Sequence, residues 1–161
     1  MRLLERHMEA VLLLDFSRAS ELLRHFGHEM RRHIEAEETV ILPVFGDRAG
    51  PVPGCTSDVF LAEHRKMLSM IDDGLAVLST KSPTPREALT YLDKAFTLKH
   101  LVEHHDRREE NLLYPWMDRI TTSGERGALL RRFIEMNGPL LEPYAVSETA
   151  QPPQRPLVGP S

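Results

Sequence analysis

Residues 103–115 read EHHDRREENLLYP, and this stretch carries the pattern from which a fold and a function can be inferred. A related stretch, RHIEAEETVILP, occupies residues 32–43. Each copy contains a histidine, then two glutamates beginning four residues later, then aliphatic residues and a proline. Because residues four apart share one face of a helix, each copy directs an imidazole and a carboxylate the same way. The two pairs are His33 with Glu37, and His105 with Glu109.

The composition of the chain limits the classes of function that it can have. Its 161 residues, of which 41% are apolar, are sufficient for one domain with a hydrophobic core. The net charge of −4 provides no basic surface, so nucleic acid is not an expected partner. The single cysteine, Cys55, rules out an internal disulfide framework. The N-terminal residues do not resemble a signal peptide and no stretch reaches membrane-spanning length, so the expected location is the cytoplasm, with no membrane partner.

The spacing of apolar residues predicts helices throughout most of the chain. The predicted helices cover about residues 1–14, 20–42, 57–80, 85–114 and 123–136. Pro43 and Pro115 are expected to end the second and fourth helices, because proline lacks an amide proton and restricts the residue before it. Four long helices with short connections predict an all-α, antiparallel up-down four-helix bundle. The predicted organisation is a bundle over 1–120, a short packing helix over 121–138 and a proline-rich, flexible tail over 139–161.

Two further histidines extend the repeat to whole hairpins. His7 and His64 each lie on the first helix of a predicted hairpin, and His33 and His105 lie on the second. Residues at equal distances from the turn of an antiparallel hairpin lie at the same height, so His7 should face His33 and His64 should face His105. Burying the accompanying carboxylates without partners would cost several kcal/mol each, which a pair of cations would offset. Nitrogen and oxygen ligands suit iron, manganese or zinc, whereas the lack of thiolates argues against structural zinc or iron–sulfur sites.

The motifs HIEAEETVILP, LAEHRKM and HHDRREENLLYP together resemble the hemerythrin-like, or HHE cation-binding, domains. The resemblance covers His7 through Pro115. It implies a four-helix bundle around a non-haem di-iron centre. The implied ligands are His7 and His33 for one iron, His64 and His105 for the other, and Glu37 and Glu109 as bridges.

The sequence departs from the oxygen-carrying hemerythrins at two points. Those proteins have another histidine one turn after the ligand on the third helix, where this chain has Leu68. They also separate the last histidine and carboxylate by five residues, which His104 and Glu109 would satisfy, whereas the internal repeat favours His105. The missing histidine shifts the expected function from stable oxygen carriage to binding or sensing of oxygen, nitric oxide or peroxide, or to iron handling, with an unknown redox partner. Iron–sulfur cluster repair and peroxide breakdown by a di-iron protein are the alternatives.

A different class of function is suggested by residues 100–104. His100, Glu103 and His104 match H-x-x-E-H, in which two histidines hold zinc and the glutamate acts as a base. This zinc-peptidase hypothesis leaves the repeat unexplained. Three other glutamates, Glu38, Glu110 and Glu63, are candidates for carboxylates that hydrogen-bond the second nitrogen of a ligating imidazole. Positions facing solvent are the alternative for Glu38 and Glu110.

Overall fold

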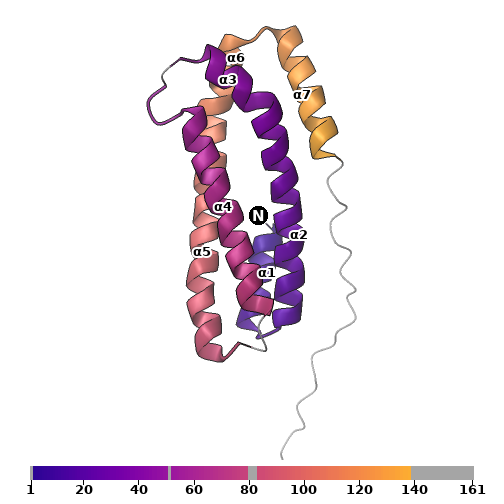
Figure 1. Cartoon of the computed structure of the whole chain (residues 1–161), viewed down its shortest axis with the longest axis vertical. Helices are drawn as coiled ribbons and strands as arrows, with labels where there is room; N and C mark the ends of the chain where they lie inside the picture. Colours follow the sequence, from indigo (N-terminus) through magenta and orange to yellow (C-terminus); the bar gives the residue numbers. More distant parts are fainter. Residues whose placement is uncertain (1, 51, 80–82, 139–161) are drawn as a thin grey trace, which may run out of the picture.

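The computed structural model describes residues 2–50, 52–79 and 83–138 of the chain (Figure 1). Within these ranges every regular element is helical and there is no strand, which confirms the predicted all-α class. The predicted tail over 139–161 lies outside the described residues. In chain order the elements are α1 (Arg2–Leu12), α2 (Phe16–Ala36), η1 (Glu37–Ile41), α3 (Leu42–Arg48), α4 (Ser57–Ser79), α5 (Pro85–Arg108), η2 (Glu109–Leu113), α6 (Tyr114–Ile120) and α7 (Ser123–Asn137).

The long helices α1, α2, α4 and α5 form the body of the molecule. Helix α1 contacts α2 and α5, and α4 also contacts α2 and α5. Figure 1 shows these helices running along the long axis, with α3 and α6 at one end. The packing is consistent with a hemerythrin-like fold, while the up-down four-helix connectivity stays a prediction.

The connection between α1 and α2 comes earlier than the sequence suggested. Helix α2 begins at Phe16, because the Asp15 side chain accepts a hydrogen bond from the backbone N–H of Arg18 at 3.0 Å and thereby caps the helix. The turn is completed by Leu14, whose φ of 59° lies in the left-handed region. The predicted start of the second helix at about residue 20 is therefore wrong. Residue 7 and residue 21 are equally far from Leu14 along the chain. In this hairpin residue 21, rather than His33, therefore lies opposite His7.

The two prolines do not end their helices as predicted. Each proline is instead preceded by one wide π-helical turn, η1 or η2, and lies second in the helix that follows. The N–H of Leu42 donates to the Glu37 carbonyl, and the N–H of Tyr114 donates to the Glu109 carbonyl, so these bonds span five residues. A proline ring clashes with the carbonyl four residues earlier, and a wider turn relieves that clash while the chain stays helical.

The core consists of two apolar clusters that lie one after the other along the length of the same helices. One cluster includes Ile34, Met67 and Val102, and the other includes Leu42, Phe60 and Leu113 among its members. Along α2, α4 and α5 the change from one cluster to the other occurs at buried histidines and glutamates. The two clusters therefore enclose a polar layer in the interior.

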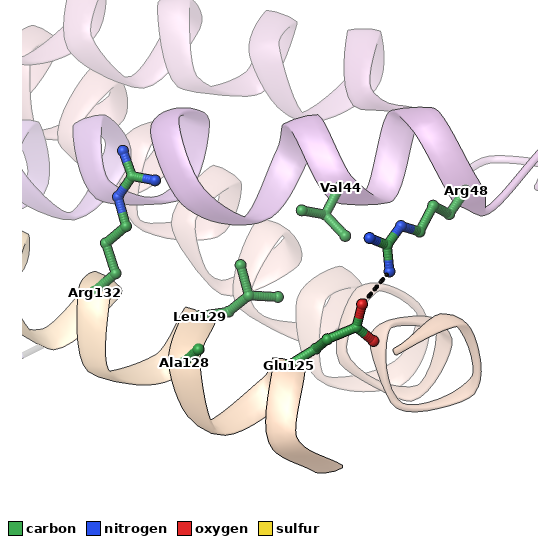
Figure 2. A pocket seen from close by; sticks show the side chains of 6 residues that line it. All are labelled: Val44, Arg48, Glu125, Ala128, Leu129 and Arg132. Atoms are coloured by element: carbon green, nitrogen blue, oxygen red, sulfur yellow. Dashed lines mark hydrogen bonds and ion pairs between the residues drawn. The ribbon is translucent and has the colours of Figure 1, made fainter. Parts of the chain in front are cut away.

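Helix α7 covers one side of this layer. It contacts α2, η1 and α6, and Thr122 and Glu125 form a capping box at its N-terminus. Figure 2 shows Glu125 of α7 paired with Arg48 of α3, at 3.0 Å. None of the helices in the described ranges is both long enough and apolar enough to cross a membrane.

Candidate metal centre

Four side chains converge in the polar layer between the two apolar clusters: those of Glu37, His64, His105 and Glu109. Each offers one ligand atom, and these atoms all lie within 4.8 Å of one another. Glu37 and Glu109 are the first residues of the two π-helical turns, and the histidines come from α4 and α5. All four residues are at most 5% exposed. The cluster is thus assembled from three separate segments of the chain and is shielded from solvent.

The two imidazoles direct the same ring nitrogen into this cluster. Nε2 of His64 lies 3.1 Å from Glu37 Oε2, and Nε2 of His105 lies 2.7 Å from Glu109 Oε1. The two Nε2 atoms are 3.2 Å apart. Nitrogen and oxygen donors at these separations surround a common point, which is the geometry that a cation site requires.

The other ring nitrogen of each histidine contacts a further carboxylate. Nδ1 of His64 lies 2.8 Å from Glu38 Oε1, and Nδ1 of His105 lies 3.0 Å from Glu63 Oε2. Arg108 holds Glu63 in place through a contact of 3.0 Å to Oε1. Because a carboxylate only accepts, each Nδ1 carries the proton that it donates, and a neutral ring then presents the lone pair of Nε2 to the cluster. Ligating histidines are oriented by partners of this kind.

Three buried carboxylate oxygens in the cluster have no hydrogen bond from any of the described residues: Glu37 Oε1, Glu37 Oε2 and Glu109 Oε1. The fourth oxygen, Glu109 Oε2, accepts a hydrogen bond from the Tyr114 hydroxyl at 2.8 Å. Buried carboxylates without partners are strongly destabilising, and lone pairs that converge on one point repel each other. A bound cation removes both penalties, so these residues fit a metal ion with nitrogen and oxygen ligands, such as iron, manganese or zinc.

The ionisable side chains of the cluster have pKa values that are shifted in different directions. Burial raises the pKa of the Glu37 carboxyl. Burial also acts to raise the pKa of Glu109, but the neighbouring imidazoles of His105 and His33 outweigh it and hold that pKa well below its ordinary value. Burial acts to lower the pKa of His105, whereas the Glu109 and Glu63 carboxylates raise it to about 9. At neutral pH a metal ion that bound here would have to displace a proton from His105, which would couple metal binding to pH.

His33 lies at the edge of the cluster rather than inside it. Its side chain is 33% exposed, and its Nε2 is 4.0 Å from Glu109 Oε1. The ring of Phe133 from α7 packs edge-on against the imidazole, with the ring centroids 5.5 Å apart. The nearby Glu109 carboxylate raises the pKa of His33. His33 is therefore near enough to share Glu109 as a ligand without being one of the four gathered residues.

The structure does not bring His7 to the cluster. The residue is fully buried, but its Nδ1 is bonded to the Ala19 carbonyl and its Nε2 to the Tyr91 hydroxyl, both at 2.8 Å. Burial lowers the pKa of His7, so the neutral ring is favoured. This placement differs from the predicted pairing of His7 with His33, because the α1–α2 turn lies earlier in the chain than expected.

The residues of the H-x-x-E-H motif lie on the outer side of α5. The side chains of His100 and His104 are 72% and 63% exposed. Glu103 is paired with Lys99 at 2.7 Å. Of the two neighbouring histidines that the sequence left open, His105 is in the buried cluster and His104 is not.

A sequence model of the family described as hemerythrin HHE cation binding domain matches residues 1–117. The chain belongs to the hemerythrin HHE cation-binding family. No curated protein and no solved structure shows significant similarity to the chain. The hemerythrin match ends before α7, so the helix that packs against His33 lies outside the matched part. The buried histidine and glutamate cluster is compatible with the metal binding after which this hemerythrin family is named.

One feature of this hemerythrin-like centre was not anticipated from the sequence. The hydroxyl of Tyr114 donates a hydrogen bond to Glu109, a role that the sequence analysis did not assign to this residue. The two residues are five apart, which places them on one face only when the intervening turn is π-helical. The signal in the sequence was the proline that follows Tyr114, because proline favours the wide turn before it.

Proposed function

We propose that this chain is a non-haem iron protein whose buried centre binds a small ligand: oxygen, nitric oxide or peroxide. The observation that carries the proposal is the convergence of unpaired carboxylate oxygens and imidazole nitrogens inside the apolar core. Such an arrangement is costly without a cation and favourable with one. Family membership supports cation binding, and the nitrogen and oxygen donors suit iron.

We further propose two metal positions of unequal affinity. The stronger position uses His64 and His105 together with the Glu37 and Glu109 carboxylates. The weaker position shares those carboxylates and adds His33, which stands 4.0 Å from Glu109. His7, with both nitrogens bonded elsewhere, contributes to neither. A position with few protein ligands retains sites for an external molecule, as open metal sites in catalysis do.

The bound iron would supply Lewis-acid and redox chemistry, and the protein would control access and orientation. Glu38 and Glu63 hold the imidazoles of His64 and His105 in the ligating tautomer. Tyr114 holds Glu109 in place by donating a hydrogen bond from its hydroxyl to the carboxylate. Phe60 packs edge-on against His105 and helps to exclude water, with the ring centroids 5.8 Å apart.

The other candidate functions are less well supported by the positions of the residues. Iron–sulfur cluster repair and peroxide breakdown use the same kind of centre, so they remain alternatives within the proposal. A zinc peptidase built on His100 and His104 would depend on two exposed side chains outside the buried cluster. We place the protein in the cytoplasm, which the single free cysteine supports, and expect a separate redox partner.

Anaerobic titration with ferrous ion, followed by metal analysis, tests this proposal. We expect about two irons per chain, the second bound more weakly, as two-metal sites imply. The His33→Ala variant should lose the weaker ion and keep the stronger one. Addition of oxygen, nitric oxide or peroxide should then change the absorption spectrum of the iron-loaded protein and identify the ligand. Uptake of zinc alone, with no binding of iron, would contradict the proposal.

A further inference from the structure

A pocket of about 390 Å³ lies between α7 on one side and η1 and α6 on the other. Most of its lining is apolar and includes Ile41, Met117, Leu129 and Phe133. The volume is within the range of sites that hold small molecules. A second pocket of about 250 Å³ also has Leu129 in its lining, together with Val44, Ala128 and the paired Arg48 and Glu125 (Figure 2).

The charged groups at the rim of the larger pocket neutralise each other. Arg126 Nε is 3.1 Å from Asp118 Oδ1, and the same guanidinium donates to the Asp118 and Thr121 carbonyls. Neither charge is thus left to attract a charged ligand. The aromatic rings of Tyr114 and Phe133 and the thioether of Met117 favour contact with another aromatic ring. The lining therefore suits an uncharged aromatic molecule.

Two side chains that line the pocket, those of Tyr114 and Phe133, also contact the candidate metal ligands. The Tyr114 hydroxyl donates to Glu109 Oε2 at 2.8 Å. Phe133 packs on the imidazole of His33, with the ring centroids 5.5 Å apart. A molecule that shifts either ring would move a carboxylate or an imidazole of the centre. The pocket is thus linked to the metal centre through two direct contacts.

We propose that this pocket binds a small, uncharged aromatic molecule and that the metal centre senses its occupancy through Tyr114 and Phe133. Binding to the pocket goes beyond the proposed function, whereas the coupling rests on it. Coupling is reciprocal, so iron binding would change the affinity of the pocket by the same factor as its occupancy changes iron affinity.

Gly127 supplies a variant that fills the pocket without disturbing the fold. Gly127 lines the pocket, and a Cβ added there would meet only the Arg131 guanidinium, at 3.7 Å. Gly124 lies on the same helix, is not part of the lining and has open space around its Cα. Gly127→Leu therefore occupies the pocket, and Gly124→Leu is its matched control for the change in helix propensity.

The binding arm of the test uses metal-free protein and indole as the probe, followed by methyl NMR. We expect saturable shifts at Ile41, Met117 and Leu129, about tenfold or more weaker binding in Gly127→Leu, and unchanged binding in Gly124→Leu. Absence of saturable shifts, or equal binding by both variants, would overturn the proposal. So would methyl shifts that depend on protein concentration or on deletion of residues 139–161 without indole, because the occupant would then be a second copy or the chain's own tail.

The coupling arm uses iron-loaded protein. Indole should change the absorption spectrum of the parent protein, and Tyr114→Phe should bind indole yet show a smaller change. An unchanged spectrum in the parent at saturating indole would overturn the coupling. Failure to load iron would overturn both the proposed function and the coupling, while the metal-free titration would still decide whether the pocket binds indole.

Discussion

His7 and His64 have matching places in the sequence repeat and nearly equal burial, yet their surroundings are opposite in character. Both are at most 1% exposed. His7 contacts a backbone carbonyl and a tyrosine hydroxyl, which satisfy both ring nitrogens without any charge. His64 lies between the carboxylates of Glu37 and Glu38. The comparison teaches that a buried histidine becomes a candidate ligand only where carboxylates converge on it.

The largest effect is expected from Glu37→Gln, which removes one converging charge while keeping the shape of the side chain. Metal affinity should fall by more than about 100-fold, because a direct ligand matters more than the residues that orient one. The metal-free protein should become about 1–3 kcal/mol more stable, because a buried carboxylate without hydrogen bonds is removed. Metal titration and denaturant unfolding in chelator measure the two effects. A less stable metal-free variant would contradict this account of the cluster.

A smaller effect is expected from Glu63→Gln, which leaves the ligands intact but alters the support of His105. Metal affinity should fall by about 10–100-fold, as is typical of carboxylates that orient a ligating histidine. The exposed Glu110, on the same turn as Glu109, provides the control Glu110→Gln, which should bind metal like the parent. Equal loss in both variants would mean that general charge, rather than the contact at Nδ1, sets the affinity.

Tyr91→Phe tests the other side of the comparison. Loss of the hydroxyl leaves Nε2 of buried His7 without its partner, so the free energy of unfolding should fall by about 1–2 kcal/mol. Metal content should stay the same, because Tyr91 and His7 lie outside the cluster. Chemical denaturation and metal analysis of the same preparation provide both measurements. Loss of metal in Tyr91→Phe would show that His7 belongs to the centre after all.

The two histidine environments also predict opposite dependences of stability on pH in the metal-free protein. The pKa of His7 is lowered from 6.5, so the unfolded chain binds more protons than the folded chain. The stabilisation of the fold by His7 is therefore present above pH 6.5 and is lost as the pH falls below that value. The pKa of His105 is raised to about 9, so the folded chain binds more protons than the unfolded chain. The stabilisation of the fold by His105 is therefore present below pH 6.5 and is lost as the pH rises from 6.5 through 9. Unfolding of the parent, His7→Gln and His105→Gln across pH 5–9 separates the two slopes. Identical pH profiles for the two variants would contradict the assignment.

The central part of the candidate site was predictable from the sequence because helix periodicity is local. The spacing of four between His105 and Glu109 fixes their common face, and the repeat drew attention to Glu37 and His64. The choice between His104 and His105 required the rotation of α5, which the sequence left open. Periodicity and composition likewise sufficed for the all-α class.

The positions that were predicted wrongly depend on local backbone detail. The second helix was predicted to begin at about residue 20, but the Asp15 side chain caps α2 at Phe16, so the turn lies several residues earlier. That shift removes His7 from the centre. Pro43 and Pro115 were read as helix ends, because a proline can either end a helix or follow a π-helical turn, and the sequence alone does not distinguish the two outcomes.

The repeat in the sequence also conceals an asymmetry of the structure. In the first copy the second glutamate, Glu38, bonds to Nδ1 of His64. In the second copy the matching glutamate, Glu110, is exposed, and Glu63 from α4 bonds to Nδ1 of His105 instead. Which carboxylate supports which imidazole depends on the contact between helices, and one sequence does not determine that contact.

The most direct test of the central claim is to measure metal content after ferrous loading in His64→Gln and His7→Gln side by side. Glutamine retains hydrogen-bonding capacity at a buried position but is a poor ligand for iron. The account predicts that His64→Gln loses the more tightly bound ion while His7→Gln binds as much iron as the parent protein. Equal loss of iron in the two variants would contradict the account, because it would mean that the centre is symmetric and that His7 is one of its ligands.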